Sequence, residues 1–388
     1  MRFCIADLAN VLKSQNKFAE AESSYRETIA LHKKLFGEDS SLADTFDDLS
    51  GVLLAQGKLT EVEICYREAL KIRGQVYGNE HLLVATSLRH LIGPLREQGK
   101  QAEADTCSQT ALSIEIKHFR AEDPRILTHL ENLANEYALQ RKYQEGDQVF
   151  SAVLDAGGNE DQTKSAELLR ARGEFRARTS RWKQAASDFA KALESNPDEH
   201  WNWYLLAPLL LQSGDPAAYR KHCQAMLARF GSTNDPPIAE RTAKASLLLP
   251  MAAADIAIAN RLADTAVTVG KDAEWLPFFQ FAKGLAEYRQ GHFDVALEWT
   301  ALALTHHGSD YRDAQAYAVQ AMAHKQLNHT NEAHLALAAG NEIAENKLPK
   351  LDSEDVGNAW HDVVMANILL REARLLIENK PAASETSK

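Results

Sequence analysis

The sequence predicts an all-α protein built as an array of antiparallel helix hairpins, an α-solenoid. Only 19 of the 388 residues are glycine and 11 are proline, and a shortage of both helix breakers favours helix. Segments of the chain recur at a period of about 41 residues. Within each period, apolar residues fall at helical spacing on two successive segments. Each unit therefore predicts two helices, which complete their core by stacking on the next pair.

Residues 1–156 predict the first four hairpins. Residues 7–12 (DLANVL) recur as residues 48–53 (DLSGVL), at an offset of 41. Equivalent residues occupy the short turn between the two helices in the four copies: Asn16, Gly57, Gly99 and Arg141. Gly93 and Pro94 fall inside the first helix of the third hairpin, where the proline predicts a kink.

Residues 157–165 predict a loop or linker, and the pair Gly157-Gly158 predicts a hinge of the array there. The period then shortens, and residues 166–345 predict five further hairpins. The one at residues 237–270 is degenerate, because Pro250 stands in place of the usual turn. An apolar stripe within residues 346–380 predicts a terminal capping helix. The polar residues 381–388 predict a disordered tail.

The shorter-period half resembles the tetratricopeptide repeat, whose unit is about 34 residues. The residues that carry the resemblance are Gly173, Trp182, Ala185, Phe189, Ala192 and Pro197. Residues 284–293 (GLAEYRQGHF), followed by Ala296 and Ala303, carry it most closely. The resemblance implies a right-handed superhelix in which the first helix of each hairpin lines a concave groove. The first four hairpins are similar to the kinesin light chain type of this repeat.

The second half also resembles the repeat regions found beside Ser/Thr kinase or WD40 domains in planctomycete-like bacteria. Residues 181–186, 200–204 and 275–284 carry that resemblance. The chain has neither the His-Arg-Asp loop nor the Asp-Phe-Gly motif of a kinase. The resemblance therefore implies, at most, a recognition module whose catalytic domain lies outside this sequence.

Composition and motifs argue against most other classes. The net charge of −11 disfavours nucleic acid and anionic membranes as partners. The four cysteines lie far apart, and His324, His329 and His334 fall on different helix faces, so no metal or disulfide framework is predicted. The sequence has no phosphate-binding glycine loop and no catalytic nucleophile motif. We expect a cytoplasmic protein with no cofactor, no metal and no catalytic residue.

The resemblance assigns candidate partner-binding residues to the groove. They are Asp47, Asp48, Arg89, Asn132, Asn135, Arg170, Trp201, Tyr204, Phe278 and Phe281. Asparagine can pair with a peptide backbone through both amide atoms, and aromatic side chains and arginine often dominate binding energy. For Trp201 and Phe278, packing on the preceding repeat is the competing interpretation. Acidic residues such as Asp47 and Asp48 fit a basic or neutral partner, or simply a solvated face.

Two functions follow from these expectations. The first is a non-catalytic scaffold that binds a peptide or protein in the groove. The alternative is a regulatory or substrate-recruiting repeat module of a bacterial Ser/Thr kinase signalling protein. Both functions are inferred from the predicted architecture, because no motif in the sequence identifies a partner.

Overall fold

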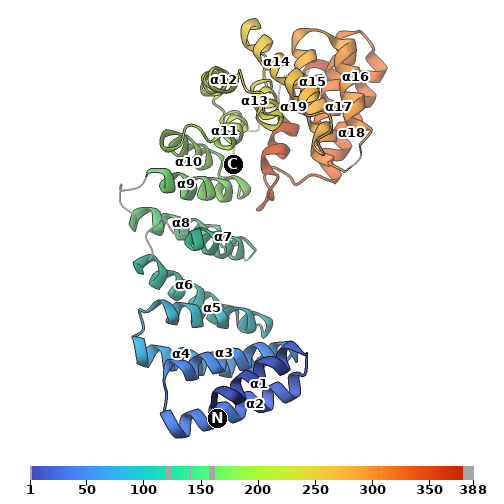
Figure 1. Cartoon of the computed structure of the whole chain (residues 1–388). Helices are drawn as coiled ribbons and strands as arrows, with labels where there is room; N and C mark the ends of the chain where they lie inside the picture. Colours follow the sequence, from blue (N-terminus) through green and yellow to red (C-terminus); the bar gives the residue numbers. More distant parts are fainter. Residues whose placement is uncertain (1, 119–123, 140, 157–161, 307, 379–388) are drawn as a thin grey trace. The chain divides into compact units, whose positions relative to one another are not determined.

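The computed structural model describes residues 2–118, 124–139, 141–156, 162–306 and 308–378. In these ranges the chain forms 19 α-helices, which pack as sequential antiparallel hairpins (Figure 1). The predicted all-α class is thus confirmed. The predicted hinge at Gly157-Gly158 and the tail at 381–388 lie outside the described residues. The chain divides into two compact units.

The first unit comprises Met1–Leu133 and Asp155–Gly157. Its helices are α1 (Arg2–Ser14), α2 (Phe18–Phe36), α3 (Ser40–Ala55), α4 (Leu59–Tyr77), α5 (Leu82–Glu97), α6 (Gln101–His118) and the first part of α7 (Pro124–Leu139). Phe46, Leu49 and Leu53 of α3 are buried against Val62 and Tyr66 of α4, as their helical spacing predicts. The hairpins of this unit therefore share one continuous apolar core.

The second unit comprises Ala134–Leu154 and Gly158–Lys388. It contains the end of α7 and most of α8 (Tyr143–Ala156), followed by α9 (Gln162–Arg178), α10 (Trp182–Ser195), α11 (His200–Gln212), α12 (Pro216–Phe230), α13 (Pro236–Ser246), α14 (Ala253–Val269), α15 (Leu276–Gln290), α16 (Phe293–Leu304), α17 (Asp310–Gln326), α18 (Thr330–Asn346) and α19 (Trp360–Glu378). Pro250 lies in the connection between α13 and α14, so the predicted degenerate copy forms a hairpin.

The tight turns share one backbone conformation. All four predicted turn residues have positive φ: Asn16 at 59°, Gly57 at 73°, Gly99 at 75° and Arg141 at 59°. Positive φ is the left-handed conformation that reverses the chain between two helices, and it favours glycine and asparagine. In the second unit, Ser180, Gly214, Gly291 and Asn328 have positive φ at their own turns.

Helix α5 continues through its internal proline and ends at Glu97, three residues later. Gly93 precedes Pro94, and a residue without a Cβ avoids the clash that the proline ring makes with a preceding helical residue. Pro94 itself is buried. The glycine thus helps the helix to continue past Pro94, and the kink that the sequence predicts there stays a prediction.

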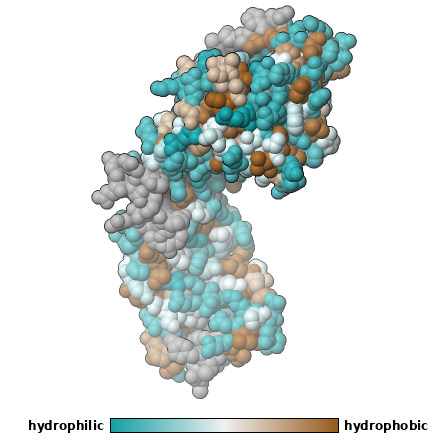
Figure 2. Space-filling view, turned by 45° about the horizontal axis from the view of Figure 1, so that its top comes forward, coloured by the Kyte–Doolittle hydropathy of each residue, from teal (hydrophilic) through white to brown (hydrophobic). Residues whose placement is uncertain are grey.

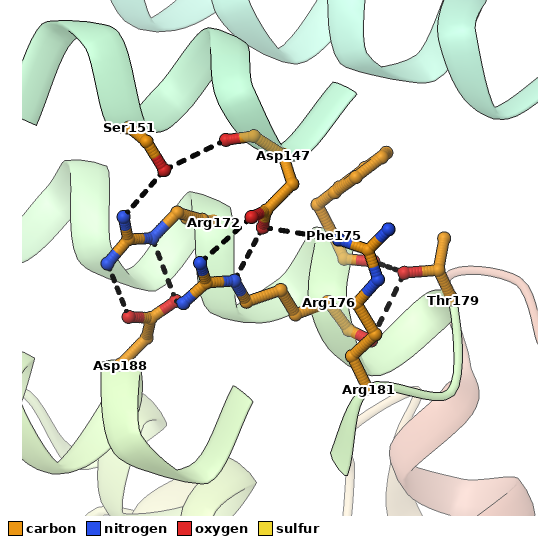
Figure 3. Close-up of polar contacts among 8 residues, drawn as sticks. All are labelled: Asp147, Ser151, Arg172, Phe175, Arg176, Thr179, Arg181 and Asp188. Atoms are coloured by element: carbon orange, nitrogen blue, oxygen red, sulfur yellow. Dashed lines mark hydrogen bonds and ion pairs between the residues drawn. The ribbon is translucent and has the colours of Figure 1, made fainter. Parts of the chain in front are cut away.

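An ion-pair network joins α8 to α9 and α10 in the second unit (Figure 3). Arg172 makes a bidentate pair with Asp188, at 2.7 and 3.0 Å, and its third nitrogen donates to Ser151. Arg176 lies between Asp147 of α8 and the same Asp188, which is only 1% exposed. Gly146 contributes as well, because a Cβ there would lie 2.5 Å from the Phe175 ring. These contacts fix α8 within the second unit.

Candidate functional site

The resemblance places partner binding on the first helix of each hairpin. We call the surface formed by the odd-numbered helices from α1 to α17 the first-helix face, and describe it separately for each unit. On the side of the molecule drawn in Figure 2, polar side chains cover most of the surface, with apolar ones scattered among them.

Three carboxylates mark the first-helix face of α3 in the first unit. Asp44, Asp47 and Asp48 lie at i, i+3 and i+4, so they share one side of the helix. Arg73 reaches this trio from α4, pairing with Asp44 at 2.7 Å and with Asp47 at 2.6 Å. Burial raises the pKa of Asp48, and the charges of Asp47 and Asp44 raise it further, against the opposing effect of Lys13. The trio therefore carries more negative charge than Arg73 neutralises.

Arg89, a predicted groove residue, is engaged in an internal ion pair. Its guanidinium donates two hydrogen bonds to the buried Glu115 of α6, one of them at 2.6 Å. His129 of α7 contacts the same carboxylate at 3.1 Å. Burial alone would raise the pKa of Glu115, but the hydrogen bonds from Arg89 and His129 lower it. Arg89 thus links α5 to α6 and leaves only 22% of its side chain exposed.

Other polar groups of this face remain accessible. His90 of α5 is exposed, lies 3.7 Å from Asp47 and packs against the Tyr66 ring at 5.1 Å. Gly93, nearly one turn further along α5, is exposed, with open space where a Cβ would lie. Asn132 of α7 is exposed too. The first unit therefore presents a polar, open first-helix face.

In the second unit, two predicted residues at the start of the face are engaged with neighbouring side chains. Asn135 accepts a hydrogen bond from Arg178 of α9. Arg170 pairs with Glu174 of its own helix at 2.6 Å. Arg178 also pairs with Asp355, at 2.6 Å, in the connection that precedes α19. Asn135 is exposed, and Arg170 is half-buried.

The four predicted aromatic residues of the second unit pack inside it. Tyr204 is 2% exposed and Phe281 is 1% exposed, while Trp201 and Phe278 are half-buried. Trp201 stacks on Tyr204, with ring centroids 5.2 Å apart, and both rings make T-shaped contacts with His361 on α19. In this structure the aromatic side chains are therefore engaged within the protein.

The reason is that α19 lies along the first-helix face of the second unit. Figure 1 shows α19 beside α13, α15 and α17. It packs on α17 and α18, as a capping helix would, and extends to α11, where Tyr204 meets Met365. Consistent with this cover, α11, α13, α15 and α17 are buried on nearly all sides.

A buried charge cluster sits where α19 begins. Lys244 of α13 pairs with Glu240 at 2.9 Å, lies 3.7 Å from Asp362 of α19, and sits over the Tyr204 ring at 5.1 Å. Burial would lower the pKa of Lys244, but the surrounding anions raise it. Burial would raise the pKa of Asp362, but Lys244 lowers it. The cluster thus holds Lys244 and Asp362 charged and attaches α19 to α13.

The sequence analysis did not single out Lys244, because it assigned the residues after 346 to a terminal cap. One pattern could have indicated the cover: residues 205–211 (LLAPLLL) of α11 are apolar in every direction around the helix. A helix that is apolar all round is buried on all sides. In a two-helix repeat this requires an additional element over the first helix.

The described ranges also bear on a metal site, a reactive cysteine and a membrane-spanning helix. No group of three or more histidine, cysteine or acidic residues there could hold a metal ion. Cys223 is fully buried, and burial raises its pKa to about 12. No described helix is long and apolar enough to cross a membrane.

Comparison with known families agrees with this architecture. Residues 2–75, which span the first two hairpins, match the family model described as tetratricopeptide repeat. These two hairpins are thus similar to tetratricopeptide repeats. The helices that follow pack as sequential antiparallel hairpins as well. No curated protein matches the sequence.

Solved structures of repeat proteins are similar at low identity. A putative kinesin light chain repeat protein of Podosopora anserina is 17% identical, with a TM-score of 0.38, covering 50% of this chain and 93% of that one. A tetratricopeptide repeat protein of Parabacteroides merdae is 14% identical, with a TM-score of 0.44, covering 68% and 94%. Yeast Tom70 is 14% identical, with a TM-score of 0.33, covering 96% of each chain.

Proposed function

We propose that the protein is a non-catalytic scaffold that binds a peptide or protein partner on the first-helix face of its first unit. The observation that carries the proposal is the open, polar surface of α3, α5 and α7. Tetratricopeptide repeats generally bind proteins or peptides, and stacked hairpins present an extended surface for such ligands. A cytoplasmic location accompanies the proposal as a prediction.

Charge supports a particular kind of partner. Asp44, Asp47 and Asp48 outnumber the cation that reaches them from α4, and the side chain of Asp44 is 69% exposed. His90 and Asn132 add hydrogen-bonding groups to the same face. A peptide with one or more basic side chains and an extended backbone complements this arrangement.

A peptide selection tests the proposal. A phage-displayed random peptide library is selected on the intact chain, and the selected peptides are measured against variants by fluorescence anisotropy. We expect His90→Ala with Asn132→Ala to weaken binding by tenfold or more. The control pair Thr60→Ala and Thr106→Ala changes exposed residues of the second helices α4 and α6 and should leave binding unchanged. Equal binding to both double variants would contradict the proposal.

The resemblance to kinase-associated repeats leaves a finer version open to test. In that version, the partner bound by the first unit is a substrate of a separately encoded or upstream kinase. Genomic sequence before the codon for Met1 tests it directly: a kinase reading frame supports this version, and a ribosome-binding site preceded by a stop codon contradicts the version in which this chain is part of a kinase.

A further inference from the structure

The connection before α19 and α19 itself contact every first helix from α9 to α17. Ser180, in the turn after α9, donates a hydrogen bond to the carbonyl of Leu351 at 2.8 Å. The backbone N–H of Val356 donates to the carbonyl of Arg178 at 2.8 Å. Gln315 of α17 donates to the carbonyl of Asp362. We call residues 348–378 the C-terminal segment.

Charge complementarity runs along this contact. Three cations of the first-helix face each meet a carboxylate of the C-terminal segment. Arg178 of α9 pairs with Asp355 at 2.6 Å, Lys244 of α13 lies 3.7 Å from Asp362, and Arg289 of α15 pairs with Glu372 at 2.6 Å. The guanidinium of Arg289 also donates to the carbonyls of Leu247 and Leu248, so it is held in place from both sides.

Apolar contacts fill the space between these pairs. The buried side chains of α19 recur at helical spacing: Trp360, Val363, Val364, Met365, Ile368, Leu369, Leu370, Ala373 and Ile377. The opposite side of the helix carries Arg371, Arg374 and Leu375, which are exposed or nearly so. An amphipathic helix that lays an apolar stripe on a complementary surface is a recurring mode of peptide recognition. Here the recognised helix belongs to the same chain.

We infer that the first-helix face of the second unit is a helix-binding surface whose resident ligand is the chain's own C-terminal segment. It takes an amphipathic helix with three spaced carboxylates. The connection between α18 and α19 gives the segment an effective concentration on the order of millimolar, so a free helix of the same kind competes poorly. A separate partner therefore binds the first-helix face of the first unit, because that of the second unit is occupied. This last step rests on the proposed function.

Cleavage of the connection tests residence of the segment in the folded protein. A protease site is inserted between Asn346 and Lys347, both of which are exposed. The intact chain is purified, cleaved, and passed over a size-exclusion column without denaturant. We expect the fragment from Lys347 onward to elute with the rest of the chain, and a fluorescent copy added at 100-fold excess to exchange in by less than a tenth over one hour.

A paired variant tests the recognition chemistry. Asp355→Asn with Glu372→Gln removes two of the three carboxylates but keeps the size of both side chains, and we expect the fragment to leave at least tenfold faster. Glu342→Gln, on α18, is the matched control and should leave the rate unchanged. No difference between the two would overturn the assigned chemistry. Release of the fragment from the unsubstituted protein on the column would overturn residence, whether or not the remainder stays folded.

The experiment distinguishes failure of this inference from failure of the proposed function, because retention of the fragment is measured without any partner. Peptides selected on the intact chain should bind intact and cleaved protein with equal affinity. Peptides that bind only after the fragment has been removed would show that the second unit is the partner-binding surface and would overturn the last step of the inference.

Discussion

The first helices of the two units carry different side chains at equivalent positions. In the first unit, α3 and α5 present Asp44, Asp47, His90 and Gly93, which are charged, polar or without a side chain. In the second unit, α11 and α15 present aromatic and aliphatic residues that are buried or half-buried, and Tyr204 of α11 contacts Met365 of α19. The hairpins themselves are alike. The residues on this face therefore decide whether it stays open or is covered.

The charged side chains of the two units also have different roles. In the first unit, Arg73 and Arg89 lie beneath the face and tie neighbouring helices together, leaving Asp44 exposed and Asp47 and Asp48 half-buried. In the second unit, Lys244 and Arg289 point to the face and are matched by carboxylates of α19. Buried pairs of this kind favour one specific arrangement when each charge is matched.

Replacing Trp360 by alanine is expected to have the largest effect on this comparison. Trp360 is 1% exposed and packs near Phe189 of α10, so truncation leaves a cavity where α19 meets the repeats. Such changes cost about 3–5 kcal/mol. Hydrogen exchange followed by mass spectrometry should show faster exchange in α11 and α19. Leu375→Ala, on the exposed side of α19, is the control and should change stability by less than about 0.5 kcal/mol.

Gly284→Leu tests packing inside a hairpin of the second unit. A Cβ at Gly284 would lie 2.6 Å from Thr300 Cγ2 and 3.2 Å from the Thr300 backbone nitrogen, so α15 and α16 must separate. Overpacking of this kind costs about 1–3 kcal/mol, and contact with backbone puts this site at the upper end. Thermal unfolding measures the loss. An unchanged midpoint would mean that α15 and α16 are not packed in this register.

Lowering the pH should destabilise the second unit before the first. Burial lowers the pKa of His222 to about 4 and also lowers the pKa of His361. The unfolded chain, with histidine pKa values near 6.5, then binds protons that the folded protein does not bind between about pH 6.5 and pH 4. Stability therefore falls as the pH drops through this window. Urea unfolding at pH 7 and pH 5 should show a loss of about 2 kcal/mol from His222.

His222→Gln isolates this contribution and should flatten the dependence of stability on pH. The carboxylates of the first unit respond lower on the pH scale, because hydrogen bonds from Lys58 and Lys100 lower the pKa of Glu22 and of Glu63. Their stabilisation is present above the unfolded value of about 4.3 and is lost only below it. An equal slope in wild type and variant would show that His222 does not remain neutral when folded.

The smallest effect is expected at the tight turns. Asn16 and Arg141 occupy the same turn position in different units, both at a φ of 59°. Asparagine tolerates this conformation, whereas it strains arginine. The exposed ion pair of Arg141 with Glu354 offsets little of that strain. We expect Arg141→Gly to raise stability by about 0.5–1 kcal/mol and Asn16→Gly to change it by less than half of that, measured by urea unfolding. A reversed order would contradict the turn assignment.

The repeat register could be predicted because each hairpin is a local unit. Recurrence of Asn16, Gly57 and Gly99 at one spacing locates the turns, and the burial of Phe46 and Tyr66 follows from helical periodicity. Such contacts join residues within one period, so the pattern of one segment predicts its neighbours.

The cover over the second unit could not be predicted in the same way. It joins Arg178 to Asp355 and Tyr204 to Met365, residues more than 150 positions apart. An amphipathic stripe shows that a helix buries one side, without showing which surface receives it. Tyr204 and Phe281 have the residue types of a binding surface and of a packed core alike. The position of α19 decides between a binding surface and a packed core.

The central claim is that the first-helix face is open in the first unit and occupied by the chain's own C-terminal segment in the second. Hydroxyl-radical footprinting of the intact chain tests it most directly, because it compares reactive side chains of both units in one sample. The account predicts rapid modification of His90 and protection of Tyr204, Phe281 and Met365. Modification of Tyr204 and Met365 as fast as that of His90 would contradict it.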